Sequence, residues 1–278
     1  MSLLSDVREV VASRELLLNL TRRELRGKYK GTALGWGWSL VNPLASTVIF
    51  TAVFSVILKI DPPVGVDGLH SYAMFLLCGL LTWNFLSGAI SSSMSVLVSN
   101  GNLIKKTYFP RRLLVLSNTA ALFVTYLIEM AVLAVVFLVL RVNVLPWIPG
   151  VLVVMLLAAV LALGLGLVLS VVNVYFRDAA HFVAIALQIW FYASPIIYPI
   201  ALVEGTRGSD GWAGTLHVAD LYLLNPVVGL VEGVRDMWYG GTWPDFAHLG
   251  YVAGVSVVLL VVGNAVFGRL EARLGEEL

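Results

Sequence analysis

Charged residues are scarce in this chain. They make up 13% of its 278 residues, against roughly 25% in an average soluble domain. Hydrophobic residues account for 59%, and the mean hydropathy is +0.89. Because the net charge is only +1, the chain also lacks the basic surplus on which non-specific nucleic-acid binding depends. The composition is typical of an integral membrane protein.

Cysteines and clustered metal ligands are lacking as well. Cys78 is the only cysteine, which excludes an internal disulfide and a thiolate metal cage. The histidines stand singly, without metal-ligand spacing, which favours surface or packing roles. They are His70, His181, His217 and His248. We expect no metal site and no cofactor bound by this chain.

Sequence motifs of common enzymes are absent too. The Gly27-Lys28 pair lacks the glycine spacing of a phosphate-binding loop, so we expect no ATP hydrolysis of that kind. No G-x-S-x-G nucleophile motif occurs either. The chain is therefore predicted not to be an enzyme.

The first thirty residues lack the uninterrupted apolar core of a cleaved signal peptide. Leucines between Arg14 and Lys30 recur at helical spacing, opposite a row of cations. We predict an amphipathic helix on the membrane surface, where anionic lipid would attract those cations. A solvated charged helix is the alternative. The cations concerned are Arg22, Arg23, Arg26 and Lys30.

Six apolar stretches approach or exceed the ~20 residues that cross ~30 Å of hydrocarbon. None alternates like the strands of an outer-membrane barrel, so all six are predicted to be helices. They are Leu34–Leu58, Tyr72–Val98, Leu113–Leu140, Val151–Val172, Phe182–Tyr198 and Phe246–Phe267. The predicted fold is an all-α single transmembrane domain over residues 1–278. It comprises a cytoplasmic interfacial segment (1–33), a six-span bundle (34–267) and a cytoplasmic tail (268–278).

The link between the second and third stretches, Asn100–Arg112, carries Lys105, Lys106, Arg111 and Arg112. Such cations favour the cytoplasmic side of a membrane. Both termini are then cytoplasmic, and the helical spans place the chain in an inner, or sole, cytoplasmic membrane. We predict a short exposed helix from Leu103 to Phe109, ended by Pro110, as a contact for a soluble partner.

The opposite side has one long link, Pro199–Asp245. Within it, Leu221–Trp238 is apolar but contains Glu232, Arg235 and Asp236, so it is too short and too charged to cross. The Asn225-Pro226 pair is typical of a helix start. We predict a re-entrant or lid element here.

Three features within the spans invite both a packing and a functional interpretation. Glu129 lies near a bilayer centre, where an ionisable group marks a buried partner or a water-filled path. Gly164, Gly166 and Ser170 allow close helix packing. The aromatic residues suit interfacial anchoring, or a surface along which sugar rings slide. The aromatic candidates for such a path are Trp36, Trp38, Trp83, Phe85, Trp190, Phe191, Tyr192 and Tyr198.

Four segments resemble one known family in order and over nearly the whole chain. They are TRRELRGKYKGTALGWGWSLVNPL (Thr21–Leu44), NLIKKTYFPRRLLVLS (Asn102–Ser117), YFRDAAHFVAIALQIWFYASPIIYPIALV (Tyr175–Val203) and LLNPVVGLVEGVRD (Leu223–Asp236). With these segments the chain resembles the permease subunit of type-2 ATP-binding-cassette polysaccharide exporters. That family moves O-antigen, teichoic acid, capsule and galactan.

The resemblance implies a transporter permease that acts as a homodimer with two copies of a separate ATPase, which binds ATP and Mg. It implies a lipid-linked glycan as substrate, spans one and five along the route, and Leu221–Trp238 in an external gate. The interfacial helix would lie near the substrate entrance. The residues implied in ATPase coupling are Leu103, Ile104, Lys105, Lys106, Tyr108, Phe109, Pro110, Arg111, Arg177 and Asp178. For Arg177-Asp178, a helix-capping pair is the alternative.

Two other functions remain open at this stage. The same architecture serves exporters of a small lipid or a drug. A membrane enzyme acting on lipid-linked sugars is the other alternative, although it would need a catalytic acid pair or a metal site that the sequence does not show. The sequence does not define the glycan.

Overall fold

Long apolar helices make up most of the protein. The computed structural model describes residues 12–29, 35–57, 59, 63–107, 109–205 and 218–271. Within these ranges the regular structure is helical, and five helices are long and apolar enough to cross a membrane. They are α3 (Trp38–Phe50) with its π-helical extension η2 (Thr51–Ile57), α4 (Tyr72–Ser99), α6 (Arg112–Val139), α7 (Ile148–Tyr175) after the 3-10 turn η4 (Leu145–Trp147), and α13 (Phe246–Leu270).

The stretch predicted as the fifth span forms a shorter helix. It is α8 (Ala179–Tyr192), of 14 residues, or about 21 Å at 1.5 Å per residue. The predicted end at Tyr198 was therefore wrong. Pro195 explains the early end, because proline disfavours helical geometry in the residue before it and cannot donate a backbone hydrogen bond. The chain turns between Ala193 and Ile197 instead.

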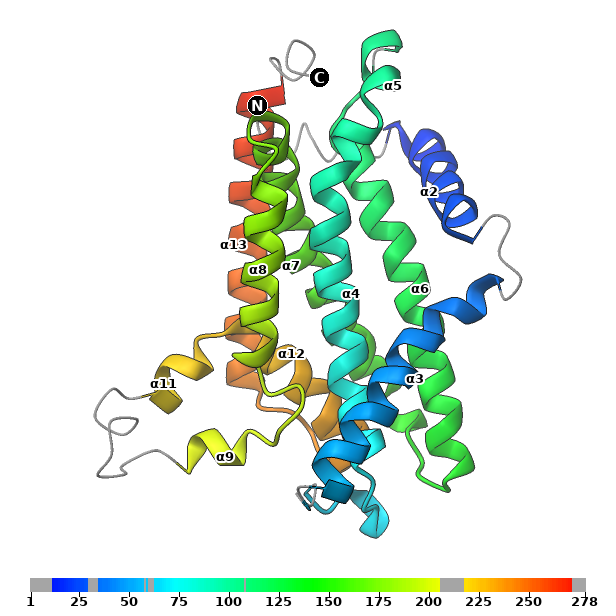
Figure 1. Ribbon diagram of the computed structural model, residues 1–278, viewed down its shortest axis with the longest axis vertical. Helices are drawn as coiled ribbons and strands as arrows, with labels where there is room; N and C mark the ends of the chain where they lie inside the picture. Colours follow the sequence, from blue (N-terminus) through cyan, green and yellow to red (C-terminus); the bar gives the residue numbers. More distant parts are fainter. Residues whose placement is uncertain are drawn as a thin grey trace.

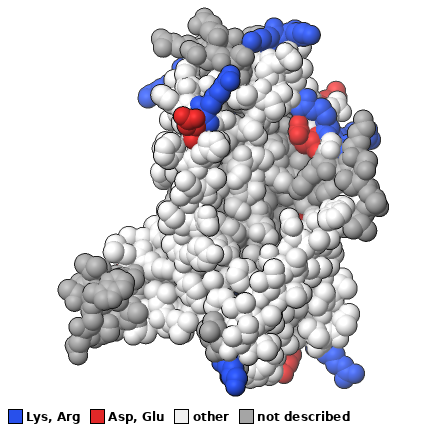
Figure 2. Space-filling model, in the orientation of Figure 1, with Lys and Arg blue, Asp and Glu red and all other residues white. Residues whose placement is uncertain are grey.

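The long helices run side by side along the length of the molecule, with α4 at the centre (Figure 1). Most of α4 is buried, whereas α3 and α13 leave most of their surface open. Figure 2 shows charged residues toward the two ends of the molecule and a broad uncharged band between them. This distribution suits a helical bundle that spans a bilayer.

Small residues bring α7 against two neighbouring helices. A Cβ placed on Gly263 of α13 would lie 2.4 Å from the carbonyl oxygen of Gly164 in α7. A Cβ on Gly166 would lie 2.7 Å from Oγ of Ser93 in α4. These contacts confirm the packing interpretation of Gly164 and Gly166, since only glycine leaves room for such approach.

The predicted amphipathic helix is present as α2 (Arg14–Tyr29), which packs beside α6 (Figure 1). Leu20 on its inner face is buried, while Arg22, Arg23 and Arg26 are exposed. Lys30 lies outside the described residues. The apolar side of α2 thus packs against the rest of the protein, and its cationic side is exposed.

The short helices lie at the two ends of the bundle. At one end is α5 (Gly101–Lys106). At the other end are the 3-10 turn η3 (Val66–Gly68), α9 (Ala201–Glu204), α11 (Val218–Leu223), α12 (Pro226–Arg235) and the π-helical turn η5 (Asp236–Gly240) (Figure 1). Asn225 caps α12 by accepting from the Val227 amide at 3.0 Å, and proline follows at the first position. The predicted helix start at Asn225-Pro226 is confirmed.

Candidate functional site

The basic link between α4 and α6 forms a shorter helix than predicted. It begins at Gly101 and ends at Lys106, because Thr107 is extended, with φ −136° and ψ 133°. The expected continuation to Phe109 was wrong, and Tyr108 lies outside the described residues. Ile104 is buried beneath the helix, whereas Lys105 and Lys106 are exposed.

Neighbouring elements anchor this link from both sides. Nη2 of Arg23 in α2 donates to Oδ1 of Asn100 at 2.7 Å, immediately before α5. The Arg111 backbone amide donates to Oε1 of Glu271 at 3.0 Å, and its guanidinium donates to the Glu271 carbonyl oxygen at the end of α13. Arg111, predicted to contact a partner, thus binds the C-terminus of a helix, where a cation is favourable.

Two further residues implied in coupling lie between α7 and α8, at the same end as α5 (Figure 1). Arg177 and Asp178 are both exposed. Asp178 occupies the position before α8, but its side chain makes no capping hydrogen bond. The capping alternative therefore receives no support.

The aromatic residues predicted along a path fall into separate groups. Trp83 of α4 contacts Trp190 and Phe191 of α8, with ring centroids 5.9 and 5.8 Å apart. Phe85, two residues further along α4, stacks instead on Tyr126 of α6 at 4.8 Å. The two groups lie on different faces of α4, because residues two positions apart in a helix do not share a face.

The remaining aromatic candidates differ in exposure. Trp38, at the start of α3, is 49% exposed, and Tyr192, at the end of α8, is 55% exposed. Tyr198 donates to the Tyr192 carbonyl oxygen at 2.8 Å and is 3.0 Å from the hydroxyl of Tyr222. The side chain of Trp36 lies outside the described residues. Tyr192 also contacts Phe191, with ring centroids 5.1 Å apart. The described candidates therefore fall into one group around Trp83 and α8 and a second that includes Phe85.

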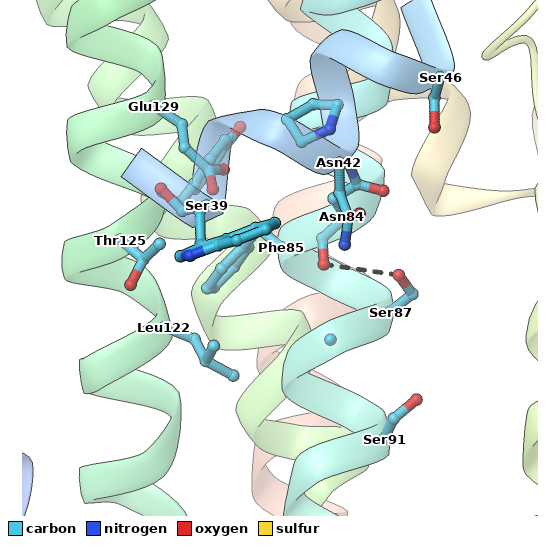
Figure 3. Close-up of a pocket in the computed structure, with 14 residues that line it drawn as sticks. Ser39, Asn42, Ser46, Asn84, Phe85, Ser87, Ser91, Leu122, Thr125 and Glu129 are labelled. Atoms are coloured by element: carbon cyan, nitrogen blue, oxygen red, sulfur yellow. Dashed lines mark hydrogen bonds between the residues drawn. The ribbon is translucent and has the colours of Figure 1, made fainter. Parts of the chain in front are cut away.

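A polar cavity lies between α3, α4 and α6 (Figure 3). Its volume is about 710 Å³, within the ~300–1,000 Å³ range of small-molecule sites. Most of the side chains that line it are polar or aromatic. They are Trp38, Ser39, Asn42, Pro43 and Ser46 of α3, Asn84, Phe85, Ser87, Gly88 and Ser91 of α4, and Leu122, Thr125, Tyr126 and Glu129 of α6.

This cavity lies within the length of three candidate membrane spans, α3, α4 and α6. Glu129 is about 25 Å along α6 from Arg112 at 1.5 Å per residue, and its side chain is largely buried at the cavity wall. Glu129 was predicted to lie beside a buried partner or a water-filled path, and it borders this cavity. Of the predicted aromatic residues whose side chains the structure describes, Trp38 and Phe85 line the cavity.

Sequence reasoning missed most of the polar residues around the cavity. They recur at helical spacing, as with Asn84, Ser87, Gly88 and Ser91 on α4. A polar stripe with steps of three and four inside a membrane span was the available signal. The signal is weak because small uncharged residues in membrane helices also serve packing alone.

A second polar centre binds the end of α8 at the opposite end of the bundle from α5. Asn225 accepts from Nε1 of Trp190 at 2.8 Å and donates to Oγ of Ser194 at 2.8 Å. Arg235, at the other end of α12, donates to the carbonyl oxygens of Pro195 and Ile196. Both ends of α12 therefore hold the turn that follows α8.

Two carboxyl groups lie beside Arg235. Glu232 accepts from Nη1 of Arg235 at 2.9 Å, and burial raises its pKa while Arg235 opposes the shift. Burial, together with the nearby Glu232, raises the pKa of Asp236 to about 6. In the described ranges, no group of three or more His, Cys, Asp and Glu residues is placed to hold a metal ion.

Comparison with known proteins identifies the family. The ABC-2 type transporter model matches residues 15–237. The chain belongs to this family. It is 30% identical over 278 residues to the O-antigen export system permease protein RfbA of Myxococcus xanthus, covering 98% of both chains. It is 27% identical over 265 residues to an RfbA of Klebsiella pneumoniae, covering 95% of both.

A third relative is named for the transport of a different polysaccharide. The polysialic acid transport protein KpsM of Escherichia coli is 25% identical over 260 residues, covering 90% of this chain and 91% of that one. The ABC-2 match includes α2, α5, the helices around the cavity and most of the α12 region. The cavity, α5 and α12 thus fall in the matched part, and the chain is a membrane subunit of a transporter rather than an enzyme.

Proposed function

We propose that this ABC-2 membrane subunit exports a lipid-linked polysaccharide across the inner membrane of a bacterium. The main support is the polar cavity between three candidate membrane spans. The chain is also similar along nearly its whole length to permeases named for O-antigen export. A membrane subunit of this kind draws its energy from a separate ATPase that binds ATP and Mg. Residues 1–278 act as one transmembrane domain, with both termini on the cytoplasmic side.

Two copies of the chain form the channel. Large apolar side chains on α3 and α8 support this arrangement because they are open on the single chain, as with Val48 (69% exposed) and Phe182 (72% exposed). Pairing would cover part of this surface, and α3 and α8 would then line the route together. The chain counts six spans, with α8 as the fifth.

The ATPase docks on the cytoplasmic end, where Lys105 and Lys106 are exposed on α5. The docking surface includes Leu103, Phe109 and Pro110, with Arg177 and Asp178 beside it, whereas Ile104, also predicted to take part in coupling, is buried beneath α5. The buried Ile104 and the Arg23–Asn100 hydrogen bond would carry a movement of α5 into α2 and the bundle. The interfacial helix α2 lies where a lipid-linked substrate enters.

At the external end, α12 acts as part of the gate. It contacts α4, α7 and α13, and its terminal residues Asn225 and Arg235 hold the turn after α8. Closure of the ATPases on nucleotide would move α5, tilt the bundle and release this end. The polymer then advances outward past the aromatic side chains.

Copurification tests the proposal. The tagged chain, expressed with the ATPase subunit of the same organism, is expected to retain that ATPase and to change its rate of ATP hydrolysis. Cells lacking the chain should accumulate lipid-linked polymer on the cytoplasmic side of the membrane. A chain that binds no ATPase and leaves polymer export intact when deleted would refute the function. Loss of a small lipid or drug phenotype alone would assign the export of that smaller substrate instead.

A further inference from the structure

The cavity between α3, α4 and α6 has side chains suited to a specific ligand. Three helices each direct a stripe of polar residues toward it, and Figure 3 shows Asn42 and Asn84 near one another on one side with Glu129 on the other. Within hydrocarbon, a polar side chain is unfavourable unless it meets another polar group or water. The convergence of three stripes on one space therefore calls for a polar occupant.

Backbone hydrogen bonds satisfy some of these side chains but not all. Ser87 donates to the Trp83 carbonyl oxygen at 2.8 Å, and Thr125 donates to that of Ala121 at 3.3 Å. The side-chain amides of Asn42 and Asn84 have no hydrogen-bond partner in the described part of the chain. Each amide offers two donors and one acceptor group, so the pair can bind vicinal hydroxyl groups.

Close helix packing does not explain why small residues border the cavity. Small residues that serve packing close the space between helices, as Gly164 and Gly263 do between α7 and α13. Around the cavity, by contrast, Ser87, Gly88 and Ser91 border about 710 Å³ of open space. The small residues here enlarge a site rather than tighten a contact.

The aromatic and acidic groups narrow the class of ligand. Trp38 is half-exposed at the cavity and offers an apolar face to the C–H side of a sugar ring. The Glu129 carboxyl accepts hydrogen bonds from hydroxyl groups, whereas its ionised form repels a phosphate. Neutral hydroxyl-rich rings therefore fit better than the phosphate group of a lipid carrier.

We propose that this cavity binds one neutral sugar residue of the lipid-linked substrate. The inference rests on the proposed export function and adds to it a defined resting site. The site is separate from the contacts of Trp83 with α8, because Phe85 and Asn84 are directed toward α3 and α6. Asn42 and Asn84 hold the hydroxyl groups, Trp38 covers the ring, and Glu129 excludes phosphate.

Protection of an introduced cysteine tests the site in the full-length chain in lipid nanodiscs. Cys78 is buried, and a Cys78→Ala background removes it as a labelling site. Ser87→Cys places the reporter at the cavity, and Ser95→Cys places a matched control on the exposed side of α4 outside it. The rate of labelling by a water-soluble maleimide is then measured in the presence of hexyl β-D-glucoside, hexyl phosphate or hexanol. Each is kept below its micelle-forming concentration.

Hexyl glucoside at about four times its dissociation constant should slow labelling of Ser87→Cys about fivefold, by occupancy of the site. It should leave Ser95→Cys unchanged. Hexanol and hexyl phosphate should protect Ser87→Cys much less. With Glu129→Gln added, hexyl phosphate should protect nearly as well as the glucoside, a change that a merely structural Glu129 would not produce.

Equal protection by hexanol would show that the cavity holds lipid tails, and would overturn the proposal. Protection without any additive that rises with protein concentration would show that a second copy covers the site, with the same consequence. Polymer export in cells that lack the chain separates this inference from the function. If glucoside protection is absent while deletion of the chain still blocks export, the sugar site fails and the export function stands.

Discussion

The guanidinium of Arg235 lies over the ring of Phe75, with Cζ 3.7 Å from the ring centroid. Its Nε also donates to the Phe75 carbonyl oxygen at 3.1 Å. One residue of α12 is therefore bound to the backbone and side chain of α4. Since Arg235 also donates to Pro195 and Ile196, it joins three segments that are distant in sequence.

Replacing Arg235 with methionine tests this junction. The variant leaves the half-buried Glu232 without its cation and removes the guanidinium donor from the carbonyl oxygens of Phe75, Pro195 and Ile196. Breaking a buried ion pair of this kind destabilises by about 3–5 kcal/mol. We expect a clear fall in the thermal unfolding midpoint in detergent, measured by fluorescence-detected gel filtration. Arg141→Met, at an exposed cation on the same end, is the control, and equal midpoints for the two variants would contradict the prediction.

The long helices were predictable because their apolar length is a strong local signal. Tyr72–Val98, for example, became α4 (Tyr72–Ser99) with the same start. The fifth span was predicted too long because hydrophobicity continues through Ile196 and Ile197, while Pro195 ends the helix. Those apolar residues are buried in a turn held by α12 rather than in a span. Hydropathy reflects a preference for apolar surroundings, so it does not distinguish a residue buried in a protein turn from one in a membrane span.

The site was less predictable because it depends on which helix faces meet. Trp38 and Phe85 were singled out for their rings, and they do border the cavity. Asn42 and Asn84 were not, since small uncharged polar residues in a membrane span also serve helix packing alone. Only the three-dimensional meeting of α3, α4 and α6 brings them together. Likewise, nothing local indicates that Arg111 binds the end of α13.

The Gly164–Gly263 contact should not tolerate a methyl group. Gly263→Ala would place its Cβ 2.4 Å from the Gly164 carbonyl oxygen, so α7 and α13 must separate. Overpacking of this kind destabilises by about 1–3 kcal/mol. Gly254→Ala on the same helix has no atom within 4 Å of the new Cβ and should be neutral or stabilising by up to about 1 kcal/mol. Thermal unfolding midpoints that rank the two alanine variants in the opposite order would refute this packing.

Stability should depend on pH through Asp236, outside the spans. Burial and Glu232 raise its pKa from 3.8 to about 6. The folded state therefore binds a proton more tightly than the unfolded state, so stability is greatest below the unfolded pKa and is lost as the pH rises through about 6. Asp236→Asn should reduce the difference between unfolding midpoints measured at about pH 5 and about pH 7.5. An unchanged difference in the variant would show that Asp236 does not contribute.

Charge reversal on α5 tests the surface proposed for the ATPase. Lys105 and Lys106 are exposed, and Ile104 beneath them holds the helix in place. The double change Lys105→Glu and Lys106→Glu should therefore leave membrane insertion and folding intact while it repels an acidic partner surface. We expect the yield of copurified ATPase to fall about tenfold or more, which corresponds to roughly 1.4 kcal/mol of binding free energy.

Lys59→Glu provides the matched control for this experiment. Lys59 is an exposed cation that follows η2, and α3 with η2 runs toward the end of the bundle opposite α5 (Figure 1), so its reversal should leave the ATPase yield unchanged. A loss of yield in both variants would indicate a general effect of charge on assembly or insertion. An undiminished yield in the α5 variant would place the docking surface elsewhere, with the exposed pair Arg177 and Asp178 as the next surface to reverse. The yield of copurified ATPase should also fall as the ionic strength rises if exposed charges hold the ATPase, because salt weakens contacts between exposed charges.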